Sequence, residues 1–79
     1  MKKIEIYTTK YCGFCHRALQ LLRSRNLEFN EVSVDGDPKL REEVSQRAGG
    51  YSTVPMIFID QEFIGGFTEL YAIDREGKL

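Results

Sequence analysis

The sequence predicts an α/β protein in which a four-stranded mixed sheet forms the middle layer of a three-layer sandwich, with three helices against its faces. Two observations support this. Strand-like and helix-like hydrophobic patterns follow one another in the order β-α-β-α-β-β-α. The first β-α-β unit requires a parallel strand pair with a right-handed crossover, whereas the closing β-β hairpin requires an antiparallel pair. The sheet must therefore be mixed.

The first strand and the first helix are the most regular predicted elements. Residues 2–9 alternate in period two and place Ile4 and Ile6 on one face, which predicts a strand. From Gly13 to about Arg25 the pattern changes to helical spacing, which predicts an amphipathic helix. The apolar positions of this helix are Cys15, Ala18, Leu19, Leu21 and Leu22.

The second strand and the second helix follow. Residues 29–34 predict a strand, because Val32 and Val34 alternate with polar residues. Asp37-Pro38 predicts a helix start, because Asp can accept the orphan backbone N–H groups and Pro at the first helical position gives up only a donor without a partner. We expect this helix to end at Gly49-Gly50. Its thin apolar stripe consists of Leu40, Val44 and Ala48.

The hairpin begins with a run that is apolar on both faces, from Val54 to Ile59. Such a run predicts a central strand covered on both sides. Pro55 cannot donate to a ladder, so it belongs at the first residue of the strand or at an irregularity. After a turn at residues 60–62, we expect Phe63-Ile64 to form the short partner strand.

The last helix follows a bend at Gly65-Gly66. Thr68 is expected to cap it, because its hydroxyl can accept an orphan N–H of the first turn. The helix carries Leu70 and Ile73 on its apolar face and should end near Gly77.

Length and charge limit the possible functions. The 79 residues, 42% of them apolar, predict one domain over residues 1–79, near the low end of what one core can support. With 11 Lys and Arg against 12 Asp and Glu, the net charge of -1 does not favour nucleic-acid or anionic-membrane binding. No apolar run approaches the roughly 20 residues that span a membrane, and the N-terminus lacks the apolar stretch of a signal peptide. We therefore expect a cytoplasmic protein.

Both cysteines lie in one motif, Cys12-Gly13-Phe14-Cys15, at the predicted turn from strand to helix. A disulfide here would close a tiny loop and constrain little of the unfolded chain, so the pair is not a structural crosslink. A Cys-x-x-Cys pair at such a turn is typical of a thiol redox site.

The two cysteines should differ in chemistry. Cys12 would occupy the helix N-terminus, where free N–H groups and the macrodipole stabilise a thiolate, and Lys10 adds a cation nearby. Cys15 falls about one turn later on the apolar face, so its thiol should be more buried and less acidic. We expect Cys12 to attack a partner sulfur and Cys15 to resolve the product by closing the Cys12–Cys15 bridge.

Other interpretations of this segment stay open. The cysteines could lie together by chance, or they could bind zinc. A structural zinc site needs four ligands, and Cys12, Cys15 and the only histidine, His16, supply three. Because imidazole titrates near neutrality, His16 could also serve as a general base. An exposed position on the helix is the favoured interpretation of His16.

Two further segments are candidate ligand sites. In Thr53-Val54-Pro55, a cis Val54-Pro55 bond would turn the Val54 backbone groups outward, where they could pair with an extended thiol peptide; a trans proline that starts a strand is the commoner case. After Gly65-Gly66, the N–H groups of Phe67 and Thr68 could hold a carboxylate while Glu69 receives an ammonium group. A simple turn with a helix cap explains the same glycine segment.

Taken together, these segments resemble the glutaredoxins, the small glutathione-dependent members of the thioredoxin superfamily. The matching segments are Ile4-Glu5-Ile6-Tyr7-Thr8, Cys12-Gly13-Phe14-Cys15-His16-Arg17-Ala18, Thr53-Val54-Pro55-Met56-Ile57-Phe58-Ile59-Asp60, Ile64-Gly65-Gly66 and Leu70-Tyr71-Ala72. The resemblance implies a thioredoxin fold and a glutathione-dependent thiol-disulfide oxidoreductase that needs no metal. It implies a monomer whose partners are glutathione and disulfide-containing or glutathionylated proteins, with ribonucleotide reductase as one candidate.

The resemblance also implies a glutathione site. It implies that Val54-Pro55 is cis and that glutathione lies across Cys12, Val54 and the turn that begins at Gly66, with Lys10 near its glycine carboxylate. The glutathione-binding residues that it implies are Lys10, Phe14, Thr53, Val54, Pro55, Gly66, Phe67, Thr68 and Glu69.

Three departures from the family pattern are visible. Gly13-Phe14 replaces the usual Pro-Tyr. In relatives, glycine at this position is associated with binding of an iron-sulfur cluster between two subunits. A [2Fe-2S] carrier with Cys12 as ligand and glutathione as co-ligand therefore stays open, as does a thioredoxin-like electron donor to a reductase. Phe67-Thr68-Glu69 stands where Cys-Asp-Asp is usual, which puts side-chain contacts to the γ-glutamyl group in question. Residues 49–52 also form a slightly longer segment than usual.

Overall fold

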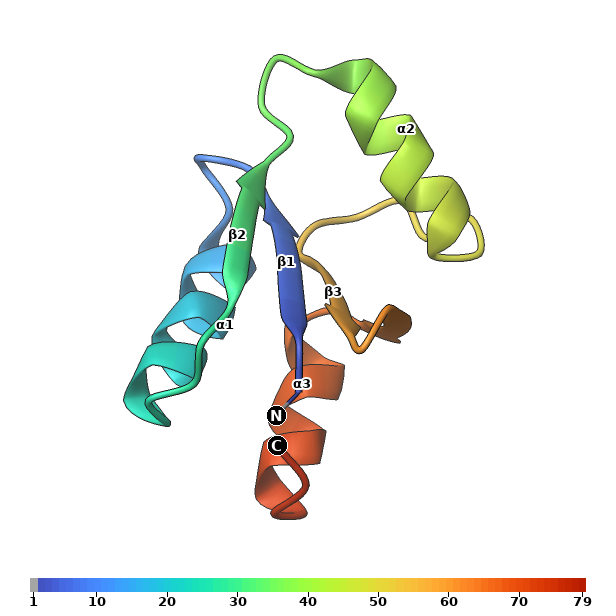
Figure 1. The fold of residues 1–79 in the computed structure, drawn as a ribbon. Coiled ribbons are helices and arrows are strands. Elements are labelled where there is room, and N and C mark those ends of the chain that lie inside the picture. Colours follow the sequence, from blue (N-terminus) through green and yellow to red (C-terminus); the bar gives the residue numbers. More distant parts are fainter. Residues whose placement is uncertain (1) are drawn as a thin grey trace.

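The computed structural model describes residues 2–79 and shows the predicted order of elements (Figure 1). Residue 1, which opens the predicted domain, lies outside the described residues. The helices and strands are β1 (Ile4–Thr8), α1 (Gly13–Ser24), β2 (Asn30–Ser33), α2 (Pro38–Arg47), β3 (Met56–Ile59), β4 (Glu62–Gly65) and α3 (Phe67–Arg75).

The sheet is mixed, as predicted, with the strand order β2-β1-β3-β4. β1 pairs in parallel with β2 and antiparallel with β3, and β3 pairs antiparallel with β4. The parallel pair results from the β1-α1-β2 crossover, and the antiparallel β3-β4 pair from a tight hairpin at Asp60 and Gln61, both at positive φ. β1 and β3 are thus the two central strands, each paired on both sides.

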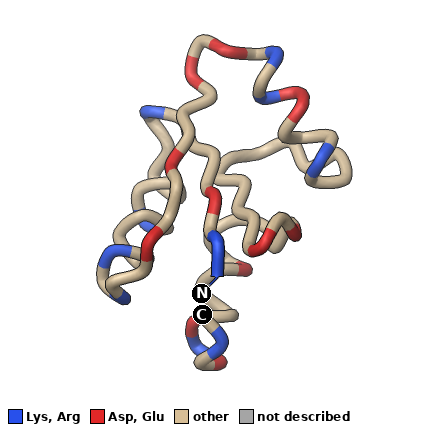
Figure 2. The backbone as a smooth tube through the Cα atoms, viewed as in Figure 1, with Lys and Arg blue, Asp and Glu red and all other residues tan. Residues whose placement is uncertain are grey.

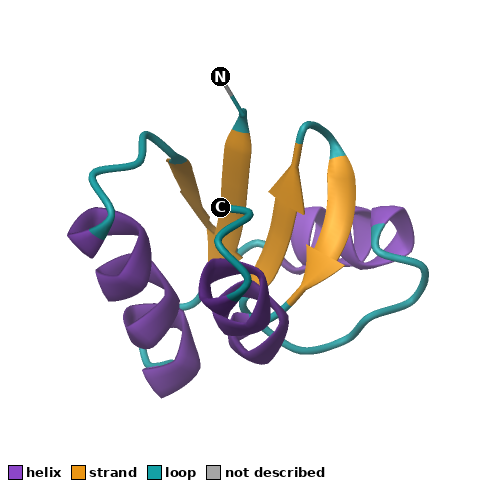
Figure 3. Cartoon of the chain, turned by 90° about the horizontal axis from the view of Figure 1, so that it is seen from below, coloured by secondary structure: helices purple, strands orange, loops and turns teal. Residues whose placement is uncertain are grey.

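Helices cover both faces of the sheet, which confirms the three-layer prediction. Figure 3 shows α1 and α3 on one face and α2 on the other. Because side chains alternate along a strand, Ile6 packs with α1 and α3 while its neighbour Tyr7 packs with α2. The first core cluster consists of Ile4, Ile6, Ala18, Leu19, Leu22, Ile57 and Leu70. The second consists of Tyr7, Val34, Val44, Ala48, Met56 and Phe58.

Two predicted element starts are wrong. The third strand begins at Met56 rather than at Val54, because Pro55 has no N–H to donate and the Val54 carbonyl faces the Cys12 sulfur. The last helix begins at Phe67 with Gly66 as its N-cap, so Thr68 does not cap it. The N–H of Gly66 instead donates to Glu69 Oε1 at 2.8 Å, which fixes the start of the helix from within its first turn.

Over the described residues 2–79, charges of both signs are mixed along the chain. Lys and Arg are interspersed with Asp and Glu along the tube in Figure 2, in keeping with the net charge of -1. Within residues 2–79, each helix is too short or too polar to cross a membrane. Long-range attraction of a charged polymer or surface is therefore not a feature of this fold, and recognition has to be local.

Candidate active site

Cys12 is the N-cap residue of α1. Its backbone is extended, with φ -125° and ψ 110°, and its carbonyl accepts the N–H of His16 at 3.1 Å. The Sγ of Cys12 accepts the N–H of Cys15 at 3.1 Å. The sulfur thus takes the place that a Ser or Asp side chain takes in an ordinary cap, at the positive end of the helix. Negative charge on this sulfur is stabilised by the backbone itself.

Cys15 lies one turn later and is fully buried, with 0% of its surface exposed. Burial raises the pKa of its thiol to about 12, and the hydrogen bond with Cys12 adds to the rise. The place of Cys15 on the apolar face of the predicted helix indicated a buried and weakly acidic thiol, and that prediction is confirmed. Both cysteines are free thiols in this structure, so it represents the dithiol form.

The Val54-Pro55 peptide bond is cis, as the family resemblance implied, and not the commoner trans form. The Cys12 thiol donates a hydrogen bond to the Val54 carbonyl across 3.6 Å. Residues 42 positions apart in the chain therefore meet at the sulfur. This contact joins the redox motif to the loop that precedes β3.

A pocket of about 390 Å³ is lined by Val54, whose carbonyl contacts the Cys12 sulfur. Its walls come from the start of α1, the loop before β3 and the start of α3. The lining residues are Phe14, Tyr51, Thr53, Val54, Pro55, Gly66, Phe67, Thr68 and Glu69. The structure thus brings together every residue of the implied glutathione site except Lys10.

Lys10 lies apart from this pocket and lines another hollow, together with His16 and Asp35. Its backbone N–H donates to Asp35 Oδ2 at 2.6 Å, and its Nζ lies 5.7 Å from the ring centroid of Tyr11, whose side chain is 90% exposed. His16 is exposed on α1, as favoured above, with Nε2 3.1 Å from the Lys10 carbonyl oxygen. In residues 2–79, no three His, Cys, Asp or Glu side chains group to hold a metal ion.

The turn before α3 brings backbone close to the pocket. Gly65 has φ +121°, and a Cβ added there would lie 2.5 Å from Glu69 Cγ, so this close approach requires glycine. Because Glu69 accepts the Gly66 N–H, its carboxylate is held at the helix start rather than free in solution. The N–H groups of Phe67 and Thr68 belong to the first turn, where helices lack internal acceptors. They can serve a ligand carboxylate.

Two stacked aromatic rings form one wall of the pocket. The rings of Phe14 and Phe67 have centroids 6.2 Å apart and an interplanar angle of 28°. Phe14 is 56% exposed, and the Arg17 guanidinium lies 5.6 Å from its ring centroid. Phe67, which departs from the usual family residue, therefore contributes an apolar surface to the site.

Sequence reasoning missed the residues that hold the loop before β3. Tyr51 lines the pocket, and its carbonyl accepts a hydrogen bond from Ser45 Oγ at 2.6 Å. The carbonyl of Ser52 accepts another from Arg41 Nη2 at 3.2 Å. Only the extra length of residues 49–52 hinted at this, because nothing in the local pattern shows that α2 reaches the loop.

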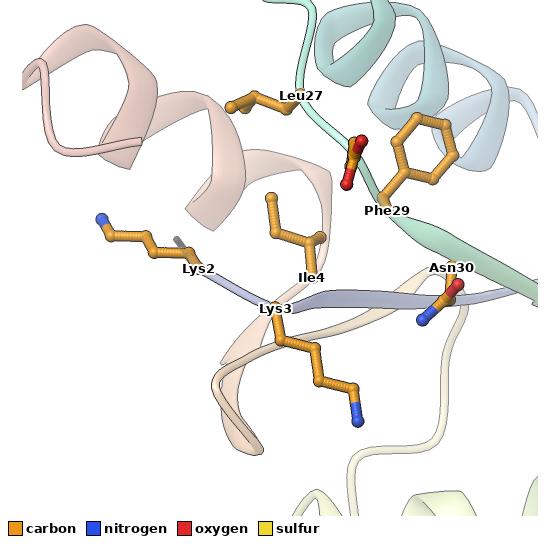
Figure 4. A pocket seen from close by; sticks show the side chains of 7 residues that line it. Lys2, Lys3, Ile4, Leu27, Phe29 and Asn30 are labelled. Atoms are coloured by element: carbon orange, nitrogen blue, oxygen red, sulfur yellow. The ribbon is translucent and has the colours of Figure 1, made fainter.

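A larger hollow, of about 620 Å³, lies around the opposite end of β1 (Figure 4). Figure 4 shows Lys3 and Asn30 on one side of the strand and Leu27 and Phe29 on the other, so the polar groups do not converge. The Nζ of Lys2, a further lining residue, donates to the carbonyl of Lys78. This hollow contains neither the cysteines nor Val54, whose carbonyl contacts the Cys12 sulfur, so volume alone does not identify the active site.

Comparison with known proteins shows the family and agrees with the fold. A model of the glutaredoxin family matches residues 4–64. The chain is 48% identical over 79 residues to glutaredoxin 3 of Escherichia coli strain K12, covering 100% of this chain and 94% of that protein. Two solved structures are also similar. The dithiolic glutaredoxin of Trypanosoma brucei brucei has a TM-score of 0.87 and 40% identity, and the match covers 99% of this chain and 82% of that chain. The buckwheat glutaredoxin-glutathione complex has a TM-score of 0.89 and 26% identity, and the match covers 99% of this chain and 73% of that chain.

Proposed function

Because the chain belongs to the glutaredoxin family of thiol-disulfide oxidoreductases, we propose that Cys12 is its nucleophile and Cys15 its resolving thiol. The observation that carries this assignment is the position of the Cys12 sulfur. It lies at the N-terminus of α1, accepts the Cys15 N–H at 3.1 Å and is 3.6 Å from the carbonyl oxygen of Val54, a residue that lines the pocket. Cys12 is also partly exposed. The buried Cys15 thiol has no such access. The comparisons do not favour a cluster carrier or an electron donor to a reductase.

With a glutathionylated protein, the Cys12 thiolate attacks the sulfur of the glutathione moiety. The new bond joins Cys12 to glutathione, the old disulfide breaks, and the protein thiolate leaves and takes a proton. A second glutathione thiolate then attacks the mixed disulfide. This step releases oxidised glutathione and restores the Cys12 thiolate. Glutathione is the reductant of the family.

With a protein disulfide, the first attack leaves Cys12 joined to one cysteine of the partner. Cys15 loses its proton as its sulfur attacks Cys12, which forms the Cys12–Cys15 disulfide and releases the partner as a dithiol. Two glutathione molecules then reduce the Cys12–Cys15 disulfide by successive thiol-disulfide exchange, which restores both thiols and releases oxidised glutathione. The one-turn spacing of the helix keeps the two sulfurs close enough for this exchange.

We further propose that glutathione occupies the 390 Å³ pocket. The Val54 backbone is oriented beside Cys12 to pair with the cysteinyl part, and the N–H groups of Phe67 and Thr68 are available to a γ-glutamyl carboxylate. Likeness to a buckwheat glutaredoxin named as a glutathione complex supports this placement. The predicted role of Lys10 at the glycine carboxylate stays a prediction, since Lys10 lies outside the pocket.

Four further properties also belong to the proposal. They are a cytoplasmic location, a monomeric state, no required metal, and ribonucleotide reductase among the disulfide substrates. The match to bacterial glutaredoxin 3, which covers 100% of this chain and 94% of that protein, supports them.

Two single substitutions test the assignment of the cysteines. Cys12→Ser should abolish turnover of a glutathionylated peptide and of a protein disulfide in a glutathione-coupled assay. Cys15→Ser, the matched control, should keep the first activity and lose the second, because only the second needs a resolving thiol. Full activity of Cys12→Ser in either assay would overturn the assignment.

A further inference from the structure

Tyr51 is fixed at the edge of the pocket by two independent contacts. Its ring packs on Phe63 of β4 with centroids 5.0 Å apart and an angle of 58°. Its backbone carbonyl accepts the Ser45 hydroxyl at 2.6 Å. Both the ring and the main chain are therefore anchored, and the hydroxyl at the end of the ring has a defined position.

The hydroxyl of Tyr51 lies over the N-cap of α3. A Cβ built on Gly66 would be only 3.0 Å from Tyr51 Oη and 3.4 Å from the Pro55 carbonyl oxygen. Gly66 and Tyr51 line the same pocket, so the absence of a side chain at Gly66 leaves this hydroxyl uncovered there. Among residues 2–79, none forms a hydrogen bond with Tyr51 Oη. The O–H of Tyr51 is therefore available to donate a hydrogen bond to a ligand.

The chemistry of the surroundings selects the acceptor. The N–H groups in the first turn of α3 can only donate, and the Tyr51 hydroxyl, which lies beside the N-cap residue Gly66, can donate as well. The nearby carboxylate of Glu69 already accepts the Gly66 N–H. A ligand group placed among these donors has to be an acceptor, and a carboxylate satisfies several of them at once.

We propose that the Tyr51 hydroxyl is a further binding group for glutathione and donates a hydrogen bond to the carboxylate of its γ-glutamyl end. This inference rests on the proposed function, because it assumes that glutathione occupies the pocket. Tyr51 raises the affinity for glutathione and favours it over thiols that lack the γ-glutamyl group. It takes no part in the exchange between sulfurs.

The test compares Tyr51→Phe with wild type on two mixed disulfides of one cysteine peptide. One carries glutathione and the other carries cysteinylglycine, which lacks the γ-glutamyl group. Tyr51→Phe should raise KM for the glutathione disulfide about tenfold, the effect of one lost hydrogen bond to a charged group. It should change kcat, and KM for the cysteinylglycine disulfide, by less than about twofold.

Tyr71→Phe is the matched control, because Tyr71 is exposed on α3 and lines a different groove. It should leave both KM values unchanged. An unchanged KM of Tyr51→Phe, or an equal rise of KM with both disulfides, would overturn the inference. A lowered thermal midpoint of unfolding would also overturn it, because it would show that the hydroxyl makes a structural hydrogen bond. A wild-type chain that does not turn over the glutathione disulfide would instead refute the proposed function.

Discussion

The N–H of Cys15 donates a hydrogen bond to the Sγ of Cys12 across 3.1 Å, while the thiol of Cys15 itself is buried. One residue therefore contributes to both proposed steps. Its amide stabilises negative charge on the attacking sulfur, and its own sulfur stays protonated until a mixed disulfide forms beside it. Burial is the main cause, because it raises the pKa of the Cys15 thiol to about 12.

The raised pKa of Cys15 predicts selective alkylation. In native Cys12→Ser, iodoacetamide should leave Cys15 almost unmodified at pH 8 to 9, since a thiol with a pKa of about 12 holds only about a thousandth of its population as thiolate at pH 9. In guanidinium the same thiol regains its ordinary pKa and should react readily. Mass spectrometry of the adduct measures both rates. Equal rates in the folded and unfolded chains would contradict the prediction.

Ser45 should affect substrate binding although it lies on α2. Ser45→Ala removes the 2.6 Å hydrogen bond to the Tyr51 carbonyl, so it should lower the free energy of unfolding by about 1 kcal/mol and raise KM for a glutathionylated peptide. Ser24→Ala is the control, because Ser24 Oγ makes a similar 2.8 Å bond to Leu21 at the exposed end of α1. Steady-state kinetics and chemical denaturation measure the two effects. If KM is the same in both variants, Ser45 does not position the loop.

Gly65→Ala should destabilise the chain by about 1–3 kcal/mol, because φ is +121° and the new Cβ would meet Glu69 Cγ at 2.5 Å. Glu69 would then leave the Gly66 N–H, which loosens the start of α3. Gly77→Ala is the control, since Gly77 also has positive φ, at +71°, but no atom within 4 Å of the added Cβ. Urea denaturation should show the larger loss for Gly65→Ala. Equal losses would show that the contact with Glu69 is unimportant.

Asp74 should contribute to stability only above acidic pH. Its carboxylate is 8% exposed and accepts two hydrogen bonds from Arg25, at 2.8 and 2.9 Å, which lower the pKa of Asp74. The stabilisation is therefore present above the unfolded-state pKa of about 3.9 and is lost as the pH falls through that value toward the lower folded-state pKa. Between about pH 5 and pH 3, the stability of wild type should fall more steeply than that of Asp74→Asn.

Thermal unfolding at several pH values measures this difference. Glu76→Gln is the control, because no ion pair of Glu76 is present within the described chain. It should keep the steep wild-type profile. Parallel profiles for wild type and Asp74→Asn would show that the ion pair between Arg25 and Asp74 does not contribute to the stability of the fold.

The sequence predicted the elements well because their signals are local. The alternation around Ile4 and Ile6 and the Asp37-Pro38 start each depend on neighbours within a few residues, and both elements are present. The start of α3 was predicted wrongly at Thr68 for the opposite reason. Two groups can cap that turn, and the choice of Glu69 depends on the close approach that Gly65 allows.

By itself, the sequence determined the fold class, the order of elements and the difference between Cys12 at the helix N-terminus and a buried Cys15, because spacing along one helix sets both positions. Only the tertiary structure decided which distant residues meet that sulfur. It placed the Val54 carbonyl 3.6 Å from Cys12, added Tyr51 to the pocket and left Lys10 outside it. These contacts join segments about 40 residues apart, and packing of α2 and α3 on the sheet fixes them rather than any local pattern.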